Sequence, residues 1–152
     1  MDDLSKWDVR YLALADSIAG WSKDPSTKVG CVIVGEAGQV LATGYNGFPR
    51  GVSDSPALLD RHRRPDKYKW TEHSERNALY NAARTGVAVC NATAYVTWFP
   101  CVDCMRGLIQ SGIACIVTTY YPDFKDERWG DDFKLGFIMM TEARMGFRFS
   151  KH

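Results

Sequence analysis

The run Val29-Gly30-Cys31-Val32-Ile33-Val34 is apolar on both faces of an extended chain. Strands of this kind are covered on both sides, because a strand with one face in water alternates apolar and polar residues. Residues 35–38 are typical of a turn and residues 39–45 of a returning strand, so the two strands are predicted to form a hairpin. The chain is therefore expected to place this hairpin inside a layered α/β domain.

Helical and strand-like patterns follow one another in the rest of the chain. Trp7, Tyr11, Leu14, Ile18 and Trp21 recur at helical spacing, which predicts an amphipathic helix over about residues 5–21. Further helices are predicted over residues 74–85, 101–111 and 131–145, and further strands over residues 93–98, 113–120 and 147–149. This order predicts a three-layer α/β/α domain with a mixed, mostly five-stranded sheet, and one domain over residues 1–152.

The charge and composition of the chain argue against some classes of binding partner. The 152 residues include 19 Lys and Arg against 18 Asp and Glu, and the net charge is +1. Proteins that hold nucleic acid by neutralising phosphates usually carry a larger basic surplus, so no large nucleic-acid partner is expected. The chain has no apolar stretch of the roughly 18 residues that span a membrane, and its N-terminus is polar rather than signal-like. Five cysteines without a signal peptide indicate reduced thiols, so we expect a cytoplasmic protein with no membrane partner.

Two short segments carry residues that are suited to binding one metal ion. Cys101 and Cys104 lie three residues apart behind Pro100, so both can face the same side at the start of a helix. His73 and Glu75 lie two residues apart, and such a pair faces one site only where a helix begins. Two helix N-termini, with their partial positive charge, would then favour thiolates at this point. Thiolates combined with imidazole select zinc.

Three protein ligands, His73, Cys101 and Cys104, would leave the fourth tetrahedral position of zinc open, as in a catalytic site. Zinc lowers the pKa of a bound water from about 15.7 to about 7. Glu75 is predicted to take the proton of that water and return it to a ring nitrogen and the leaving amine. The order His-x-Glu and then Pro-Cys-x-x-Cys is the signature of zinc nucleobase deaminases.

The Cys-x-x-Cys pair alone also fits half of a structural zinc site or a redox pair. A structural site needs a fourth protein ligand, and the chain has no second Cys-x-x-Cys to supply it. A redox pair would not need an upstream His-x-Glu at a helix start. Cys31, Cys90 and Cys115 lie in apolar, strand-like surroundings and are predicted to be core residues. His62 and His152 are given no role.

At these residues the chain resembles the deoxycytidylate (dCMP) deaminases of the cytidine deaminase-like superfamily. The resemblance covers nearly the whole chain and includes residues 22–30, residues 44–51 and the length and basic character of the loop before His73. It implies a cytidine deaminase-like fold, zinc bound by His73, Cys101 and Cys104, and Glu75 as proton shuttle. The implied reaction converts dCMP and water to dUMP and ammonia and feeds thymidylate synthesis.

Two positions depart from the usual pattern of that family. Ser74 stands where Ala is common, and Arg76 stands where an apolar or acidic residue is usual, so the exact nucleotide stays open. A deaminase of a tRNA adenosine, a guanine-type base or a modified nucleotide is the alternative, although the net charge and residues 44–51 argue against tRNA. A non-catalytic zinc module is disfavoured, because an open metal position beside a carboxylate has no structural purpose.

The resemblance also suggests residues that contact the substrate. Asn46, on a Gly-flanked loop, is predicted to contact the base or sugar, with a plain turn Asn as the alternative. Lys28 and Arg50 flank the two resembling segments and are candidates for binding the phosphate, which needs cationic groups. Arg84 lies farther along the helix of Glu75 and is a candidate effector or subunit contact.

Two further features each leave alternatives open. Tyr120, Tyr121 and Phe124 are predicted either to stack on the base or to be core or interface residues. The basic run over residues 61–69 lies in a long irregular connection over residues 46–70. This run is either an exposed face, a flap over a nucleotide phosphate or an effector site. The resemblance further implies a homo-oligomer, often a hexamer, activated by dCTP and inhibited by dTTP, with Mg²⁺ accompanying a nucleotide effector.

Overall fold

Five strands form one mixed sheet in the computed structural model of the chain, which describes residues 4–150. The strands are β1 (Gly30–Val34), β2 (Val40–Tyr45), β3 (Thr93–Val96), β4 (Cys115–Thr118) and β5 (Gly146–Phe149). Their order across the sheet is β2-β1-β3-β4-β5. β1 runs antiparallel to β2 and β3, whereas β3, β4 and β5 are parallel. The predicted hairpin and the predicted mixed sheet are both confirmed.

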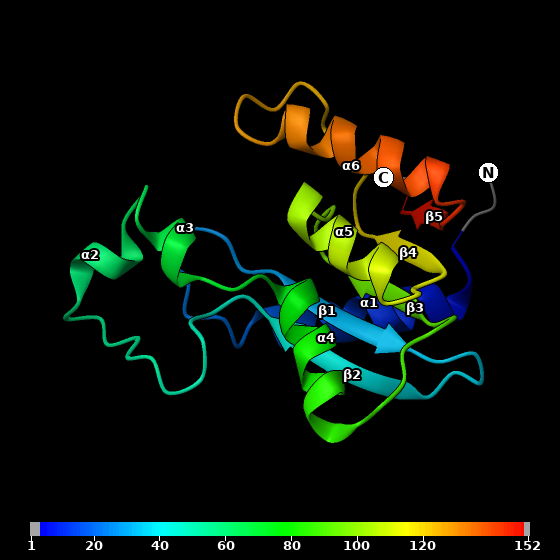
Figure 1. Cartoon of the computed structure of the whole chain (residues 1–152), viewed down its shortest axis with the longest axis horizontal. Coiled ribbons are helices and arrows are strands. Elements are labelled where there is room, and N and C mark those ends of the chain that lie inside the picture. The colour runs from blue at the N-terminus through cyan, green and yellow to red at the C-terminus, as the bar shows by residue number, and fades with distance from the viewer. Residues whose placement is uncertain (1–3, 151–152) are drawn as a thin grey trace.

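Helices cover both faces of this sheet (Figure 1). One face carries α1 (Lys6–Ala19), and the other carries α4 (Ser74–Thr85), α5 (Val102–Gln110) and α6 (Gly130–Glu142). β1 serves both layers, since Val32 packs with residues of α1 while Cys31 and Ile33 belong to the core beneath α4 and α5. The predicted three-layer α/β/α fold is therefore confirmed, and the doubly apolar pattern of β1 follows from its two packed faces.

The first helix differs from its prediction in the face that it buries. A capping box between Ser5 and Asp8 starts α1, and the helix ends at Ala19 rather than near residue 21. Its buried face is centred on Ala15, because the β1 backbone approaches so closely that a Cβ on Gly30 would lie 2.0 Å from the Ala15 carbonyl oxygen. Trp7 and Trp21 of the predicted apolar stripe are exposed instead.

A second close approach fixes the helix that carries the candidate site. A Cβ on Gly44 of β2 would lie 2.3 Å from the carbonyl oxygen of Ser74 and 2.4 Å from the backbone nitrogen of Ala78. Only glycine at this position lets the first turn of α4 lie directly on the sheet. The helix ends, as predicted, at Gly86, which has a φ of 71°.

The long connection between β2 and α4 extends to one side of the layered body (Figure 1). It contains two single-turn helices, α2 (Leu59–His62) and α3 (Lys67–Trp70), in a region that we expected to be irregular. Its last residues return to the sheet through an antiparallel bridge between Gly47 and Glu72, directly before α4. The connection is thus anchored at the point where His73 follows.

The cysteines outside the Cys-x-x-Cys pair were all expected in the core. Cys31 is fully buried and Cys115 is partly buried, but Cys90 is exposed, so the prediction for Cys90 is wrong. Cys90 lies in the loop after α4 rather than in a strand. His152 lies outside the described residues. No helix within residues 4–150 is long and apolar enough to cross a membrane.

Candidate metal and catalytic site

Three potential metal ligands meet where α4 and α5 begin. His73 is the N-cap residue of α4, Cys101 is the N-cap residue of α5, and Cys104 lies in the first turn of α5. The ligand atoms of the three residues all lie within 4.8 Å of one another, and Cys101 Sγ is 3.3 Å from His73 Nδ1. This is the only such group of His, Cys, Asp and Glu within residues 4–150. The predicted ligand set is therefore brought together by two converging helix starts.

The donor set has the chemistry that zinc requires. The hydrogen bond from the Cys104 thiol lowers the pKa of Cys101, and the contact with His73 lowers it further. The hydrogen bond with Cys101 raises the pKa of His73 in turn. The side chains of Cys101, Cys104 and His73 are thus linked by hydrogen bonds, and a bound cation would take the place of the protons in these bonds. Two sulfurs and one imidazole nitrogen fit Zn²⁺ and would leave one tetrahedral position for a non-protein ligand.

Glu75 is the carboxylate next to this group. Its side chain is 4% exposed and lines the same cavity as His73 and Cys101, but it does not belong to the ligand group. Burial raises the pKa of Glu75. The hydroxyl of Ser74, which is fully buried, donates a 2.9 Å hydrogen bond to Glu75 Oε2. A buried carboxylate with a raised pKa suits a group that accepts and releases a proton near neutral pH.

The segments that present the ligands are tied together. Glu72 Oε1 accepts hydrogen bonds from the backbone nitrogen of His73 at 3.0 Å and from Arg76 Nε at 2.6 Å. Arg76 also faces Asp103 of α5, with 3.9 Å between Nη1 and Oδ2. Arg76, one of the two positions that depart from the resembling pattern, therefore bridges the two helices that carry the ligands.

A third helix start supports the site as well. Asp132 Oδ2 accepts a 2.8 Å hydrogen bond from the backbone nitrogen of Val102, so the start of α6 is attached to the start of α5. Trp129, just before α6, places its ring edge-on to His73 with 6.4 Å between ring centroids. Trp129 and Phe133, at the start of α6, thus form part of the cavity wall near His73.

These elements enclose a cavity whose empty volume, including its open mouth, is about 730 Å³. The cavity is lined by Asp24, Thr27, Val29, Asn46, Arg64, Lys67, Tyr68, Thr71, His73, Ser74, Glu75, Trp98, Phe99, Cys101, Trp129 and Phe133. Six of these sixteen residues are aromatic or aliphatic, and polar side chains lie at the metal ligands and around Asp24 and Lys67.

Asn46 lies in this wall and is 6% exposed. Its Oδ1 accepts a 2.9 Å hydrogen bond from the Val29 backbone, and its Nδ2 donates a 2.8 Å bond to the Thr27 carbonyl oxygen. The amide therefore fastens the loop before β1 to the end of β2. One hydrogen on Nδ2 and one lone pair on Oδ1 are left over for a ligand.

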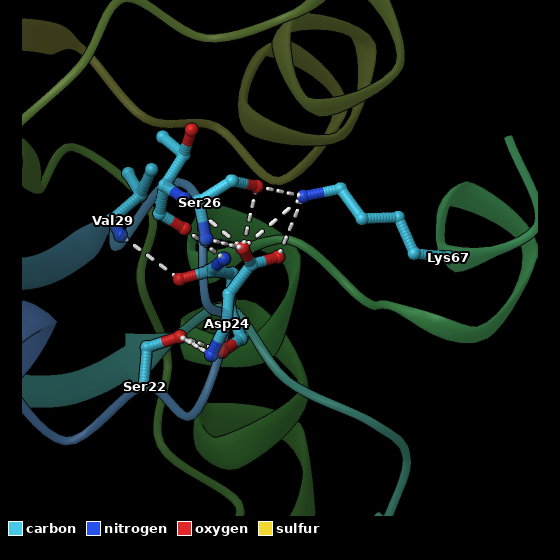
Figure 2. Close-up of polar contacts among 7 residues, drawn as sticks. Ser22, Asp24, Ser26, Val29 and Lys67 are labelled. Carbon is cyan, nitrogen blue, oxygen red and sulfur yellow. Dashed lines mark hydrogen bonds and ion pairs between the residues drawn. The ribbon is translucent and has the colours of Figure 1, made fainter. Parts of the chain in front are cut away.

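Two lining residues of the cavity, Lys67 and Asp24, form an ion pair (Figure 2). Lys67 Nζ lies 3.0 Å from Asp24 Oδ2 and 2.5 Å from Ser26 Oγ. Asp24 Oδ1 also accepts hydrogen bonds from the backbone nitrogens of Ser26 and Thr27, at 2.8 and 3.0 Å. Burial raises the pKa of Asp24, but the hydrogen bonds from Thr27, Ser26 and Lys67 outweigh it and lower the pKa overall. The pair joins the loop before β1 to helix α3.

The structure does not bring every predicted substrate residue to the cavity. Lys28 and Arg84 are exposed and outside its wall, and Arg50 is bonded instead to Asn81 of α4. Tyr121 packs against the rings of Phe124, Phe137, Phe147 and Phe149, also outside the wall.

The basic run over residues 61–69, for which a flap over a nucleotide phosphate was one of the predicted roles, contributes Arg64 and Lys67 to the wall. Trp129 and Phe133 also line the cavity, and sequence reasoning did not single them out.

A His/Cys/Cys group with an open side, a buried Glu in the same cavity and a three-layer α/β/α frame define a zinc-dependent deaminase site. Residues 5–120 match the family model described as the cytidine and deoxycytidylate deaminase zinc-binding region. The chain belongs to this deaminase family.

Two curated relatives resemble the chain over most of its length. An "Uncharacterized deaminase in luxG 3'region" of Aliivibrio fischeri is 38% identical, covering 92% of this chain and 90% of the relative. A "Probable deoxycytidylate deaminase" of Caenorhabditis elegans is also 38% identical, covering 95% of this chain and 70% of the relative.

Among solved structures, the dCMP deaminase of cyanophage S-TIM5 in complex with dCMP and dUMP has a similar fold. The TM-score is 0.76 at 23% identity, and the match covers 97% of this chain and 99% of that chain. The expected fold is confirmed by this similarity.

Proposed function

We propose that this chain catalyses the zinc-dependent hydrolysis of dCMP to dUMP and ammonia. The observation that carries the proposal is the buried carboxylate of Glu75 in one cavity with His73 and Cys101, whose donor set with Cys104 fits zinc. The choice of dCMP is supported by the relative of Caenorhabditis elegans named a probable deoxycytidylate deaminase, which matches 95% of this chain.

In this mechanism the protein groups hold the base and move two protons, one after the other. When bound, zinc supplies a water molecule whose pKa is low enough for attack at neutral pH. Glu75 would transfer two protons in turn. It accepts one from the attacking water and delivers it to the ring nitrogen, and it then takes the second from the hydroxyl on C4 and delivers it to the amino group. The oxygen stays on C4 and ammonia leaves, so that dCMP and water become dUMP and ammonia.

The cavity wall has two tasks in this scheme. Trp129 and Phe133 stack nearly parallel, with ring planes 19° apart, and form an apolar wall near His73 that suits a flat pyrimidine and excludes bulk water. Asn46 would use its remaining donor and acceptor on the base or sugar. Lys28, Arg50 and Tyr121 stay sequence predictions, because they lie outside this wall.

The proposal extends to assembly and regulation by family resemblance. A homo-oligomer, with a hexamer as the expected form, would be activated by dCTP and inhibited by dTTP, with Mg²⁺ accompanying the effector. Arg84, exposed at the end of α4, would serve an effector or a subunit contact. The whole of residues 1–152 would act as one domain in the cytoplasm.

The test is a substrate panel with zinc-loaded protein. Ammonia release would be followed with dCMP, CMP, deoxycytidine, dCTP, a guanine-type base and a tRNA anticodon stem. We expect the highest kcat/KM for dCMP. Turnover of deoxycytidine without turnover of dCMP would overturn the phosphate requirement, and turnover of the base or the tRNA alone would establish the alternative substrate class. Zinc bound without turnover of any member would instead indicate a zinc module.

A further inference from the structure

The proposed substrate carries a phosphate, and the cavity offers few cations to bind it. Within residues 4–150 the lining includes three side chains that can carry positive charge: Arg64, Lys67 and His73. His73 belongs to the metal group. A cationic contact to the phosphate from the wall of this cavity must therefore come from Arg64 or Lys67, rather than from Lys28 or Arg50.

Lys67 is already committed to other partners. Its ammonium group is buried, and it contacts both oxygens of Asp24, at 3.1 and 3.0 Å, and the hydroxyl of Ser26 (Figure 2). An ammonium has three hydrogens to donate, and these three contacts account for them. Turning Lys67 toward a phosphate would leave the carboxylate of Asp24 buried without its counter-ion, which is costly.

Arg64 is in the opposite situation. Its side chain is exposed at the cavity wall and makes no hydrogen bond or ion pair with any residue in the described part of the chain. A guanidinium offers five N–H donors in a planar fork that matches a phosphate group. An exposed and unpaired Arg in the cavity wall can bind a charged group that projects from the pocket.

The backbone around Arg64 is anchored. The Lys67 backbone nitrogen donates a 2.8 Å hydrogen bond to the Arg63 carbonyl oxygen, which closes the turn that contains Arg64. The ion pair of Lys67 with Asp24 then fastens this turn to the loop before β1. The position of Arg64 is thus set by its neighbour in the turn, while its own side chain remains available.

We propose that Arg64 binds the 5′-phosphate of the nucleotide substrate and so determines the preference for a nucleotide over a nucleoside. This inference rests on the proposed function, because it assumes that a nucleoside monophosphate enters the cavity. It assigns the phosphate to a residue of the long connection rather than to the segments that resemble the family signatures. Lys67 acts here only by holding the turn in place.

The experiment compares Arg64→Ala, Arg64→Lys and the matched control Arg63→Ala in the zinc-loaded full chain. Arg63 is the adjacent exposed Arg and lies outside the cavity wall. We expect Arg64→Ala to raise the KM for dCMP by about 10- to 100-fold, because a charge-assisted contact is lost. Arg64→Lys should recover part of this loss, and Arg63→Ala should stay within about twofold of the wild type, as surface substitutions usually do.

Inhibition by the product tests whether the phosphate is what Arg64 contacts. The inhibition constant of dUMP should rise in Arg64→Ala by a factor similar to that of the KM, whereas zinc content and melting temperature should not change. Equal KM and inhibition constants in Arg64→Ala and Arg63→Ala would overturn the assignment while leaving dCMP as the substrate. A wild-type protein that holds zinc but does not deaminate dCMP would overturn the proposed function itself, and this inference with it.

Discussion

Cys101 Sγ lies 3.3 Å from His73 Nδ1, although 28 residues separate the two in the chain. Each is the residue that precedes the first turn of a helix, α5 for Cys101 and α4 for His73. The contact exists because the two helices begin side by side on one face of the sheet, with α4 seated on Gly44 and α5 packed against α4. The packing of the two helices therefore positions the metal ligands.

Replacing one sulfur ligand should remove the metal. We expect Cys101→Ser to hold well under one zinc per chain after dialysis against a weak chelator, because a hydroxyl is a poor substitute for a thiolate. Zinc measured by mass spectrometry checks this. Cys90→Ser is the matched control, since Cys90 is an exposed cysteine outside the ligand group. Full zinc in Cys101→Ser would contradict the ligand assignment.

Replacing the proton shuttle should separate metal binding from turnover. Glu75→Gln keeps the shape of the side chain but cannot accept and return a proton, so kcat should fall by about 100- to 10,000-fold. Zinc content should remain that of the wild type, because Glu75 is not in the ligand group. Ammonia release and metal analysis on the same sample check both points. Glu36→Gln, in the exposed turn after β1, should leave both unchanged.

The buried ion pair should be more sensitive to the loss of one charge than of both. Lys67 and Asp24 have side chains 7% and 8% exposed, so Lys67→Met leaves a carboxylate buried without its partner. We expect the free energy of unfolding to drop by about 3 to 5 kcal/mol. Adding Asp24→Asn should restore part of the loss, because the amide keeps an oxygen for the backbone of Ser26 and Thr27.

Urea unfolding of Lys67→Met and of the double variant, Lys67→Met with Asp24→Asn, checks this argument. A double variant less stable than Lys67→Met would mean that the loss comes from packing of the lysine chain rather than from an uncompensated charge.

The fold should lose stability in acid through Asp8. Tyr95 of β3 and Arg148 of β5 donate hydrogen bonds to Asp8 Oδ1 at 2.8 and 2.7 Å, which ties α1 to the sheet. Burial alone raises the pKa of Asp8, but the hydrogen bonds from Arg148, Tyr95 and Ser5 outweigh it and lower the pKa below 3.8. The stabilisation is therefore present above that value and is lost as the pH falls through the lower, folded pKa.

Thermal melts from pH 6 downward would measure this effect. Asp8→Asn should lower the melting temperature at neutral pH and flatten the decline below about pH 4. Asp16→Asn, in an exposed position of the same helix, should decline like the wild type. If the melting temperature of Asp8→Asn falls with pH as steeply as that of the wild type, the acid sensitivity comes from other groups.

The sequence predicted those features that local spacing determines. The ligand set His73, Cys101 and Cys104 followed from spacing and from the positions of helix starts, and the structure brings the three together. The buried strand β1 followed from its apolar run. The face of α1 did not follow, because it is set by the close approach of Ala15 to Gly30, and small residues give only a weak signal in an apolar pattern.

The cations of the cavity wall followed only in part from the sequence, which left a flap over a phosphate as one of several roles for the basic run over residues 61–69. Lys28 and Arg50 were chosen because they flank motifs in the sequence, yet Arg64 and Lys67 line the cavity. The path of the long connection depends on the ion pair of Lys67 with Asp24, 43 residues away, and no periodicity encodes that contact.

The coordination of the metal is the most direct test of the account. X-ray absorption at the zinc edge would be measured on the wild-type protein with one zinc per chain. We predict two sulfur ligands at about 2.3 Å and two nitrogen or oxygen ligands at about 2.0 to 2.1 Å, that is, Cys101, Cys104, His73 and one non-protein ligand. Three or four sulfur ligands would contradict an open catalytic site at this position.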